Sequence, residues 1–201
     1  MIADYTARIA GRTLEYYDDT HTYLVDGVEV PSVTQIIRAT FPDRYAAADP
    51  ARLAAAAAEG TAVHAAIQDY IENGVTDPAR KRMIQHFAFL CERHELTVQG
   101  SEVPLILFAN GIPASAGRCD LVLTRGSKVV GADIKHVSAI DKAYLTAQLN
   151  LYRIGYMQSY GVLWDEIAGI QLHGETRKYI PLRINESLAD ELLLKYAEET
   201  Q

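Results

Sequence analysis

Cysteine is scarce in this sequence, and its scarcity excludes two common kinds of metal site. The 201 residues include 2 cysteines, Cys91 and Cys119, which are far apart and show no CxxC spacing. Most structural zinc sites need four ligands and iron–sulfur clusters usually need four thiolates, so cysteine cannot build either site here. We therefore expect both residues to be buried as small hydrophobic side chains.

Long apolar runs are also absent. No stretch approaches the ~20 residues that a transmembrane helix requires. The first residues, 1–5, include an early acid and lack the basic-then-apolar pattern of a secretory signal. The composition, 49% hydrophobic and 22% charged, is typical of a globular domain. We therefore expect a cytoplasmic protein without a membrane partner, located in a bacterial host cell if the chain is phage-encoded.

The chain lacks the excess of basic residues that proteins coating nucleic acid usually carry. Its formal net charge is −7 at pH 7, which counts against nonspecific binding along nucleic acid. The charge is nevertheless uneven. Residues 118–153 hold six basic and three acidic side chains, whereas residues 185–201 hold five acidic side chains and one lysine. The basic segment is compatible with an enzyme that acts on nucleic acid, and the acidic end is most simply a solvated helix face.

Length and composition predict a single domain over residues 1–201, since no linker, repeat or composition break divides the chain. The patterns indicate an N-terminal hairpin with a short helix, then a core, then a C-terminal strand with a helix. These parts cover residues 1–48, 49–173 and 174–201.

Capping signals predict where the helices begin. Asp49-Pro50 and Asp77-Pro78 each place a good N-cap residue before a proline, and proline favours the first helical position. The expected helices cover residues 35–40, 50–72, 78–94, 142–160 and 188–198, with a loop at 41–48.

Apolar alternation and turn dipeptides predict the strands. A hairpin is expected between Leu14 and Val30, around the turn at Asp26-Gly27. Further strands are expected at residues 102–109, 114–124, 128–135, 166–173 and 177–184. The core then has the order α-β-β-β-α-β, which indicates an α/β (mixed α+β) fold with a central mixed β-sheet flanked by helices.

The triplet Asp133-Ile134-Lys135 ends one of these strands and is the first candidate site. Residues i and i+2 of a strand share a face, so the Asp133 carboxylate and the Lys135 amine lie side by side. The preceding hairpin can bring Asp120 next to Asp133. Two converging carboxylates repel each other unless a proton or a cation lies between them, and Mg²⁺ or Mn²⁺ suits that position. Taken alone, such a triplet is more often a surface Asp–Lys pair on an edge strand.

Two helices carry further candidates. Gln148 and Tyr152 are four residues apart on one helix face, and both can donate hydrogen bonds to phosphate oxygens. Tyr152 also belongs to an apolar stripe, which makes a core tyrosine an equal alternative. Gly60 precedes His64 by one turn in an alanine-rich helix, where glycine lowers stability by roughly 1 kcal/mol. That choice suggests that another element approaches Gly60 and that His64 faces a cleft, although a lone helix histidine is more often merely half-buried.

Together these motifs resemble the RecB-like branch of the PD-(D/E)XK nucleases, in particular its phage-type and mitochondrial-type single-domain exonucleases. The resemblance covers residues 59–173, and segment 31–34 resembles the N-terminal part of the same exonucleases. The matching motifs are Gly60-x-x-x-His64, Glu102-Val103-Pro104-Leu105, Gly117-Arg118-x-Asp120, Asp133-Ile134-Lys135 and Gln148-Leu149-x-x-Tyr152. The resemblance implies a restriction-endonuclease-like core and a metal-dependent deoxyribonuclease of phage, recombination or repair DNA processing. An exonuclease is favoured over an endonuclease.

The resemblance also implies a role for each residue. The catalytic residues would be Asp120, Asp133, Lys135, Gln148 and Tyr152. Mg²⁺ or Mn²⁺ would be bound by His64, Asp120, Asp133 and the backbone carbonyl of Ile134, with Glu102 in a supporting role. Beyond these roles, we expect Arg118, His136 and Lys142 to bind substrate, with the alternative that His136 faces the opposite side of the strand.

Two other functions stay open. A chain with this fold can bind nucleic acid without cutting it, but decayed nucleases usually lose an acid or the lysine, and both are present. An accessory subunit would use helix 188–198 to dock on a helicase, recombinase or single-strand-binding protein, although its apolar stripe is more often core. DNA, single-stranded or with duplex ends, is the expected partner. Four aromatic residues are candidates either to stack on bases or to pack: Tyr16, Tyr17, Phe41 and Tyr45.

Overall fold

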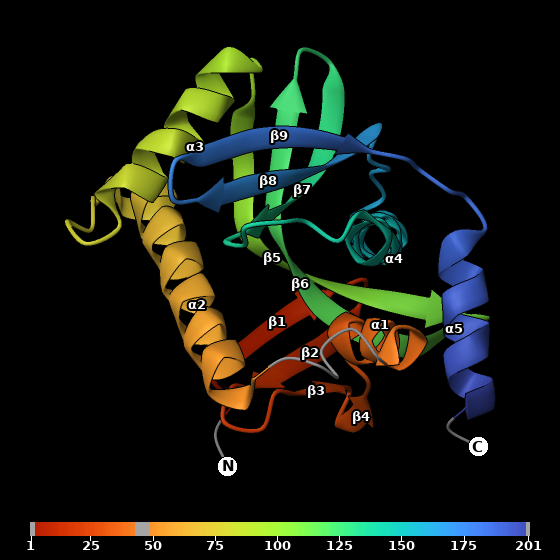
Figure 1. Cartoon of the computed structure of the whole chain (residues 1–201). Helices are drawn as coiled ribbons and strands as arrows, with labels where there is room; N and C mark the ends of the chain where they lie inside the picture. Colours follow the sequence, from red (N-terminus) through yellow and green to blue (C-terminus); the bar gives the residue numbers. More distant parts are fainter. Residues whose placement is uncertain (1–2, 43–48, 200–201) are drawn as a thin grey trace.

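Two β-sheets form the framework of the chain, one of four strands and one of five (Figure 1). The computed structural model describes residues 3–42 and 49–199, and this part contains five α-helices. The chain therefore has a mixed α/β architecture, as the predicted order of helices and strands indicated. Within the described ranges, none of the helices is both long enough and apolar enough to span a membrane.

The four-stranded sheet is an antiparallel meander of strands in chain order. The strands are β1 (Tyr5–Ile9), β2 (Arg12–Tyr17), β3 (Thr22–Val25) and β4 (Val28–Val30). The hairpin predicted around Asp26-Gly27 is confirmed as the pair β3–β4, but it is one part of a larger sheet, because β2 and β1 extend it. Both turn residues have positive φ, 52° and 80°, as tight hairpin turns require. β1 and the turn after it were missed because a strand this short gives a weak apolar signal.

Three helices precede the larger sheet. They are α1 (Val33–Thr40), α2 (Pro50–Asn73) and α3 (Lys81–Arg93). The start predicted for α2 is confirmed, since the Asp49 carboxylate accepts a hydrogen bond from Arg52 N. Gly74 closes the helix in the left-handed conformation. α1 begins with a capping box in which Ser32 and Gln35 satisfy each other's backbone N–H groups.

The predicted start of the helix at residue 78 is wrong. The Asp77 carboxylate accepts a hydrogen bond from Ala79 N, 2.8 Å away, and so closes a separate turn before α3 begins. Of the loop predicted at residues 41–48, residues 43–48 lie outside the described part of the chain.

The five-stranded sheet is mixed and has the order β5-β6-β7-β8-β9. Its strands are β5 (Thr97–Ala109), β6 (Ile112–Arg125), β7 (Lys128–Lys135), β8 (Glu166–His173) and β9 (Thr176–Leu182). Only β7 and β8 are parallel, and helix α4 (Lys142–Tyr160) makes the crossover that a parallel pair needs. All five strands were predicted, although β5 begins at Thr97 rather than at Glu102.

Helices cover both faces of this sheet (Figure 1). One hydrophobic core joins α1, α4 and the last helix, α5 (Leu188–Glu199), to the sheet, and a second joins α2 and α3 to it. The smaller sheet packs on β5 and β6 through a third core. Trp164 is fully buried against β7, and Gly131 is the residue that leaves room for its ring, because a Cβ there would overlap the indole. Pairing and packing thus fix the ends of β5, β6 and β7 relative to α2 and α4.

Candidate metal centre and active site

Glu102 and Asp120 face each other on neighbouring strands. In the antiparallel pairing of β5 and β6, Ser101 lies opposite Leu121 and Val103 lies opposite Cys119. Glu102 and Asp120, which lie between these two pairs, are therefore opposite one another. Glu102 has a φ of 47°, in the left-handed region that residues with side chains seldom adopt. Backbone strain of this kind costs roughly 1–3 kcal/mol and tends to occur at functional sites.

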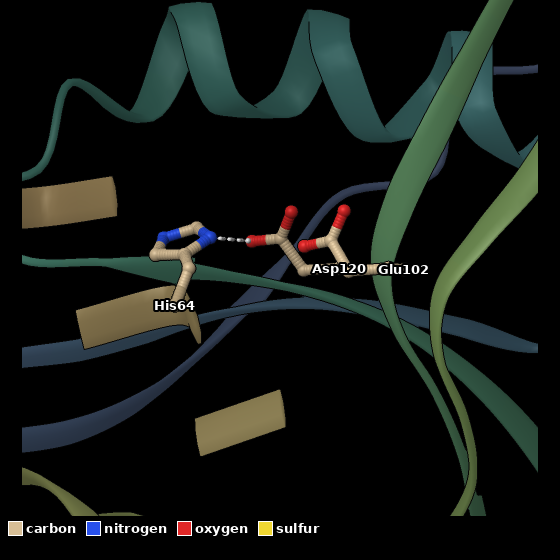
Figure 2. A group of neighbouring side chains, drawn as sticks. All are labelled: His64, Glu102 and Asp120. Carbon is tan, nitrogen blue, oxygen red and sulfur yellow. Dashed lines mark ion pairs between the residues drawn. The ribbon is translucent and has the colours of Figure 1, made fainter. Parts of the chain in front are cut away.

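His64 completes a group of three possible metal ligands. It projects from α2, and Figure 2 shows Asp120 between His64 and Glu102. One ligand atom of each residue lies within 4.8 Å of those of the other two, and Nδ1 of His64 is 3.4 Å from Oδ2 of Asp120. We call these three residues the ligand cluster. Sequence reasoning gave Glu102 only a supporting role, whereas its carboxylate belongs to this close group.

The hydrogen bonds of His64 determine which ring nitrogen faces the acids. Its Nε2 lies 2.8 Å from the carbonyl oxygen of Ile134. A carbonyl can only accept, so Nε2 carries the proton. In the neutral ring, Nδ1 then directs its lone pair toward Asp120, and a cation between the two groups would satisfy both. Metal-binding histidines commonly donate their other N–H to a backbone carbonyl. The Ile134 carbonyl, predicted as a metal ligand, is thus placed as the hydrogen-bond partner of His64.

The Asp120 carboxylate is held in place by the same short segment of β7. Its Oδ2 accepts a hydrogen bond from the backbone N–H of Ile134, 2.7 Å away. The backbone of Ile134 therefore orients both His64 and Asp120, one through its carbonyl and the other through its amide. Such fixed partners keep two ligand side chains in one geometry before any ion binds.

Asp133 and Lys135 form a second group beside the ligand cluster, on one face of β7 as strand periodicity predicted. Nζ of Lys135 lies 2.7 Å from Oδ2 of Asp133. Asp133 is 1% exposed, and within the described residues its Oδ1 accepts no hydrogen bond. Burial, followed by the nearby Asp120 carboxylate, raises the pKa of Asp133 to about 6. Asp133 is not one of the three closely grouped ligands.

Lys135 remains charged although it is partly buried. Burial alone would lower the pKa of its amine, but the carboxylates of Asp133 and Asp120 outweigh that effect and raise the pKa. The result is a fixed positive charge beside a pair of acids.

Helix α4 adds two buried polar side chains to this group. Nζ of Lys135 donates a hydrogen bond to Oε1 of Gln148 at 3.4 Å, and Nε2 of Gln148 donates to the Tyr152 hydroxyl at 3.5 Å. The Tyr152 ring also packs in the core formed by α1, α4 and α5, so its interpretation as a core residue is confirmed, and its role in the site stays a prediction. Burial raises the pKa of Tyr152, which keeps the phenol protonated and able to donate.

Two glycines near the site, Gly117 and Gly60, differ in the space around them. A Cβ on Gly117 would lie 2.9 Å from Cε1 of Tyr152 and 3.3 Å from Cγ2 of Val33, so glycine is needed there for close packing. A Cβ on Gly60 would meet nothing within 4 Å. The expectation that another element approaches Gly60 is therefore wrong, and Gly60 instead faces an open cavity.

Two cavities lie on either side of the acids. One, of about 430 Å³, lies between α1, the smaller sheet and Tyr152, and the other, of about 480 Å³, lies between α2 and the end of β7. Both cavities are lined by Tyr16, His21, Glu102 and Arg118. The two cavities therefore adjoin along these residues beside the ligand cluster, and together we call them the cleft. Lys135 and His64 line its α2 half.

Of the three predicted substrate-binding residues, Arg118 and His136 line the cleft and Lys142 does not. Arg118 lies in both halves of the cleft, with its guanidinium 4.8 Å from the Tyr16 ring centre and its Nε 3.6 Å from a Glu102 oxygen. His136 lines the α2 half. Lys142 does not line the cleft and belongs instead to a separate cavity beside β9.

Of the aromatic residues considered for base stacking, two are packing residues. Tyr16 is 5% exposed and its ring packs on Tyr23, and Phe41 packs on Tyr144. Tyr45 lies outside the described residues. The exposed ring in the cleft is His21, which sequence reasoning missed because a single histidine in a turn gives no pattern.

The C-terminal helix α5 packs through its apolar face against the core that contains α1 and α4. Two of its residues, Ala189 and Leu192, are buried there. The core interpretation of its apolar stripe is therefore confirmed over the docking interpretation.

Comparisons with known proteins assign this chain to no family. No family model matches the sequence, and no curated protein matches it either. Among solved structures, the chain is similar to one described as "Crystal structure of SSO0001", with 14% sequence identity and a TM-score of 0.45 over 86% of this chain and 76% of that one. A likeness of this degree says nothing about activity, and the function must be inferred from the residues of the site.

Proposed function

We propose that this chain is a divalent-metal-dependent deoxyribonuclease of the PD-(D/E)XK type, related to the RecB-like branch. The observation that carries the proposal is the closeness of His64, Glu102 and Asp120 to the Asp133–Lys135 pair, beside a cleft that His64, Glu102 and Lys135 line. These residues come from α2, β5, β6 and β7, so no local sequence feature alone accounts for their meeting.

The arrangement of elements supports the same proposal. From residue 81 to residue 173 the elements follow the order α3, β5, β6, β7, α4, β8, which is the order expected of a restriction-endonuclease-like core. Glu102 lies on the edge strand β5, Asp120 on the neighbouring β6, and Asp133 on β7, the strand that begins the parallel crossover.

The donor set fits Mg²⁺ or Mn²⁺. Carboxylate oxygens are the ligands that hard divalent ions prefer, and one imidazole is compatible with Mn²⁺. The buried Asp133 carboxylate, which has an oxygen without a hydrogen-bond partner in the described part of the chain, adds an acid that a nearby positive charge would stabilise. His64, Glu102 and Asp120 would hold the ion, with Asp133 next to it. When bound, the ion would supply Lewis acidity and a water of lowered pKa.

The remaining side chains have roles that follow from their positions. Lys135 is a fixed positive charge at the cleft wall, suited to hold the attacking water or to stabilise charge on the phosphate. Gln148 accepts from Lys135 and donates to Tyr152, so it fixes the direction of the amine. Arg118, in both halves of the cleft, is placed to bind phosphate.

We further propose an exonuclease that acts on DNA ends in phage, recombination or repair processing, on the basis of the sequence resemblance. Partners would be DNA and, where unwinding is needed, a helicase or recombinase. A catalytically inert binding protein is the alternative, and the complete set of site residues argues against it.

Cleavage of end-labelled single-stranded and duplex DNA tests the proposal. Wild type is compared in EDTA, Mg²⁺ and Mn²⁺ with Lys135→Ala and with Lys128→Ala, an exposed lysine at the other end of the same strand. We expect metal-dependent cleavage by wild type and Lys128→Ala, and a loss of roughly 100-fold or more for Lys135→Ala. Binding without cleavage in any metal would instead identify an inert binding protein.

A further inference from the structure

A cavity on the outer side of the molecule gathers basic and aromatic residues away from the cleft. It measures about 430 Å³ and lies between the end of α3 and the edge strand β9. Arg93, Arg177 and Lys178 line it, and no acidic residue does. The lining of this cavity is therefore positively charged, although the whole chain has a net charge of −7.

The side chains of this cavity are arranged by packing rather than by ion pairs. The Arg177 guanidinium lies 4.0 Å from the centre of the Phe89 ring, and the His94 ring stacks on Tyr179 with 4.6 Å between centres. Among the described residues, no carboxylate pairs with Arg93, Arg177 or Lys178. Their charges therefore remain available to an external anion.

A second, smaller cavity continues this surface around the edge of β9. It measures about 330 Å³, and it shares Lys178 and Ile180 with the first cavity. Lys142 lines it, again without an acidic residue, and so does the loop segment 138–140.

The second cavity in turn adjoins the cleft. Val137 lines the α2 half of the cleft, and the next residue, Ser138, lines the second cavity. The Gln171 side chain holds these two consecutive residues in place, because it donates hydrogen bonds to the carbonyl oxygens of Val137 and Ser138, at 2.8 and 3.0 Å. Basic residues thus follow one another from Lys135 in the cleft to Arg93 at the end of α3.

We propose that this surface, formed by Lys142, Lys178, Arg177 and Arg93 and called here the basic track, binds the phosphodiester backbone of a nucleic-acid strand outside the cleft. The identity of the polyanion rests on the proposed function, since the track opens beside the proposed active site. Single positive charges on separate side chains suit the evenly spaced phosphates of a strand. The stacked Tyr179–His94 rings and the Phe89–Arg177 pair offer flat surfaces that tolerate any base.

The track also accounts for the position of Lys142. Sequence reasoning placed this residue with the substrate, yet it lies outside the cleft. On the proposed path it is the first contact beyond the cleft, on the way to Lys178.

Binding measured without catalysis tests the track. Fluorescence anisotropy in EDTA follows labelled single-stranded DNA of about 5 and about 30 nucleotides, lengths chosen to fill the cleft alone or the cleft and the track. The variant is Arg93→Glu with Lys178→Glu. The matched control is Lys81→Glu with Arg82→Glu, which makes the same charge change at the exposed start of α3.

For the long oligonucleotide we expect the track variant to bind roughly tenfold more weakly at moderate salt, with a salt slope reduced by about 0.7 for each lost contact. The short oligonucleotide should bind the track variant and wild type alike, and the control should resemble wild type with both lengths. Circular dichroism confirms that each variant is folded.

The outcomes separate the track from the nuclease. The track is refuted if the track variant binds the long oligonucleotide as tightly as wild type does. It is also refuted if the variant loses affinity for the short and the long oligonucleotide by the same factor. Both conclusions hold even when wild type cleaves DNA. If wild type does not bind DNA in EDTA, the track is refuted as well. If the length-dependent loss occurs but no metal supports cleavage, the track stands and the nuclease proposal fails. In Mn²⁺, a track variant that cleaves the short oligonucleotide at the wild-type rate shows an intact catalytic site.

Discussion

Glu102 combines several unfavourable features at one residue. It has positive φ, it faces Asp120, and burial followed by the Asp120 charge raises its pKa to about 7. Arg118 opposes this shift only in part. A residue under backbone strain and charge repulsion lowers the stability of the fold, and such residues persist where a ligand or reaction requires them.

The first prediction follows from that pKa. Because the folded-state pKa of Glu102 lies at about 7, above its ordinary value of 4.5, its contribution to stability is lost as pH rises from about 4.5 through 7. Glu102→Gln carries no such charge. In EDTA at pH 8 we expect the variant to be more stable than wild type by roughly 2 kcal/mol, with the difference disappearing near pH 4.5. Thermal melts of both proteins at a series of pH values measure it. A variant less stable than wild type at pH 8 would show that the pair with Arg118 dominates instead.

The second prediction concerns Gly117, where a methyl group would press on the Tyr152 ring. Both Tyr152 and Val33 are buried, so the ring must shift and take its hydroxyl away from Gln148. We expect Gly117→Ala to reduce cleavage roughly 10- to 100-fold and to lower stability by about 1–3 kcal/mol.

The control for this prediction is Gly60→Ala, in which the added methyl group meets open space. It should keep near wild-type cleavage and stabilise α2 by up to about 1 kcal/mol. Equal activity of the two variants would remove Tyr152 from the site.

At the scale of elements, α2 supplies one wall of the cleft as well as His64. Ala56, Ala57 and Gly60 line the α2 half of the cleft, so this face of the helix carries small residues beside an open space. An alanine-rich helix has high intrinsic propensity, and it can therefore remain helical while leaving room for a ligand.

The third prediction uses this wall. Ala57→Phe places a ring in the cleft, whereas Ala58→Phe, one residue further, is exposed and does not line it. We expect Ala57→Phe to raise the KM for DNA roughly tenfold or more, while metal binding is unchanged because His64 lies almost two turns away. Steady-state cleavage kinetics and metal titration of both variants distinguish these effects. A similar KM for the two variants would mean that substrate does not pass along α2.

The elements also show what the sequence could reveal and what it could not. Asp49-Pro50 predicted the start of α2 because its capping chemistry is local. The same reasoning failed at Asp77-Pro78, because the Asp77 side chain closes a turn instead. The role of Glu102 was underestimated, since it depends on a register between β5 and β6 that no local pattern fixes. The Asp133–Lys135 pair was placed correctly because residues i and i+2 of a strand point to the same face, whatever strand lies beside it and in whatever register.

At the scale of the whole molecule, an acidic protein is proposed to act on an acidic polymer. Lys135, Arg118 and the basic track provide positive charge along the proposed path of DNA. At the ligand cluster itself, however, acids outnumber bases, and only a bound cation can reverse the local sign. The stability of the fold should therefore depend on metal.

The last prediction follows from this dependence. An ion that binds only the folded chain stabilises it by about 2.7 kcal/mol when its concentration is 100 times its dissociation constant. Bound metal requires ionised acids, and the raised pKa values of Glu102 and Asp133 mean that protons compete below about pH 7. We expect Mn²⁺ to raise the melting temperature by several degrees at pH 8 and by much less at pH 5.5. Lys135→Ala, which removes no ligand, should retain the pH 8 shift, whereas Asp120→Ala should abolish it. A shift that survives in Asp120→Ala would place the ion elsewhere, and the cluster of His64, Glu102 and Asp120 would not be the metal centre.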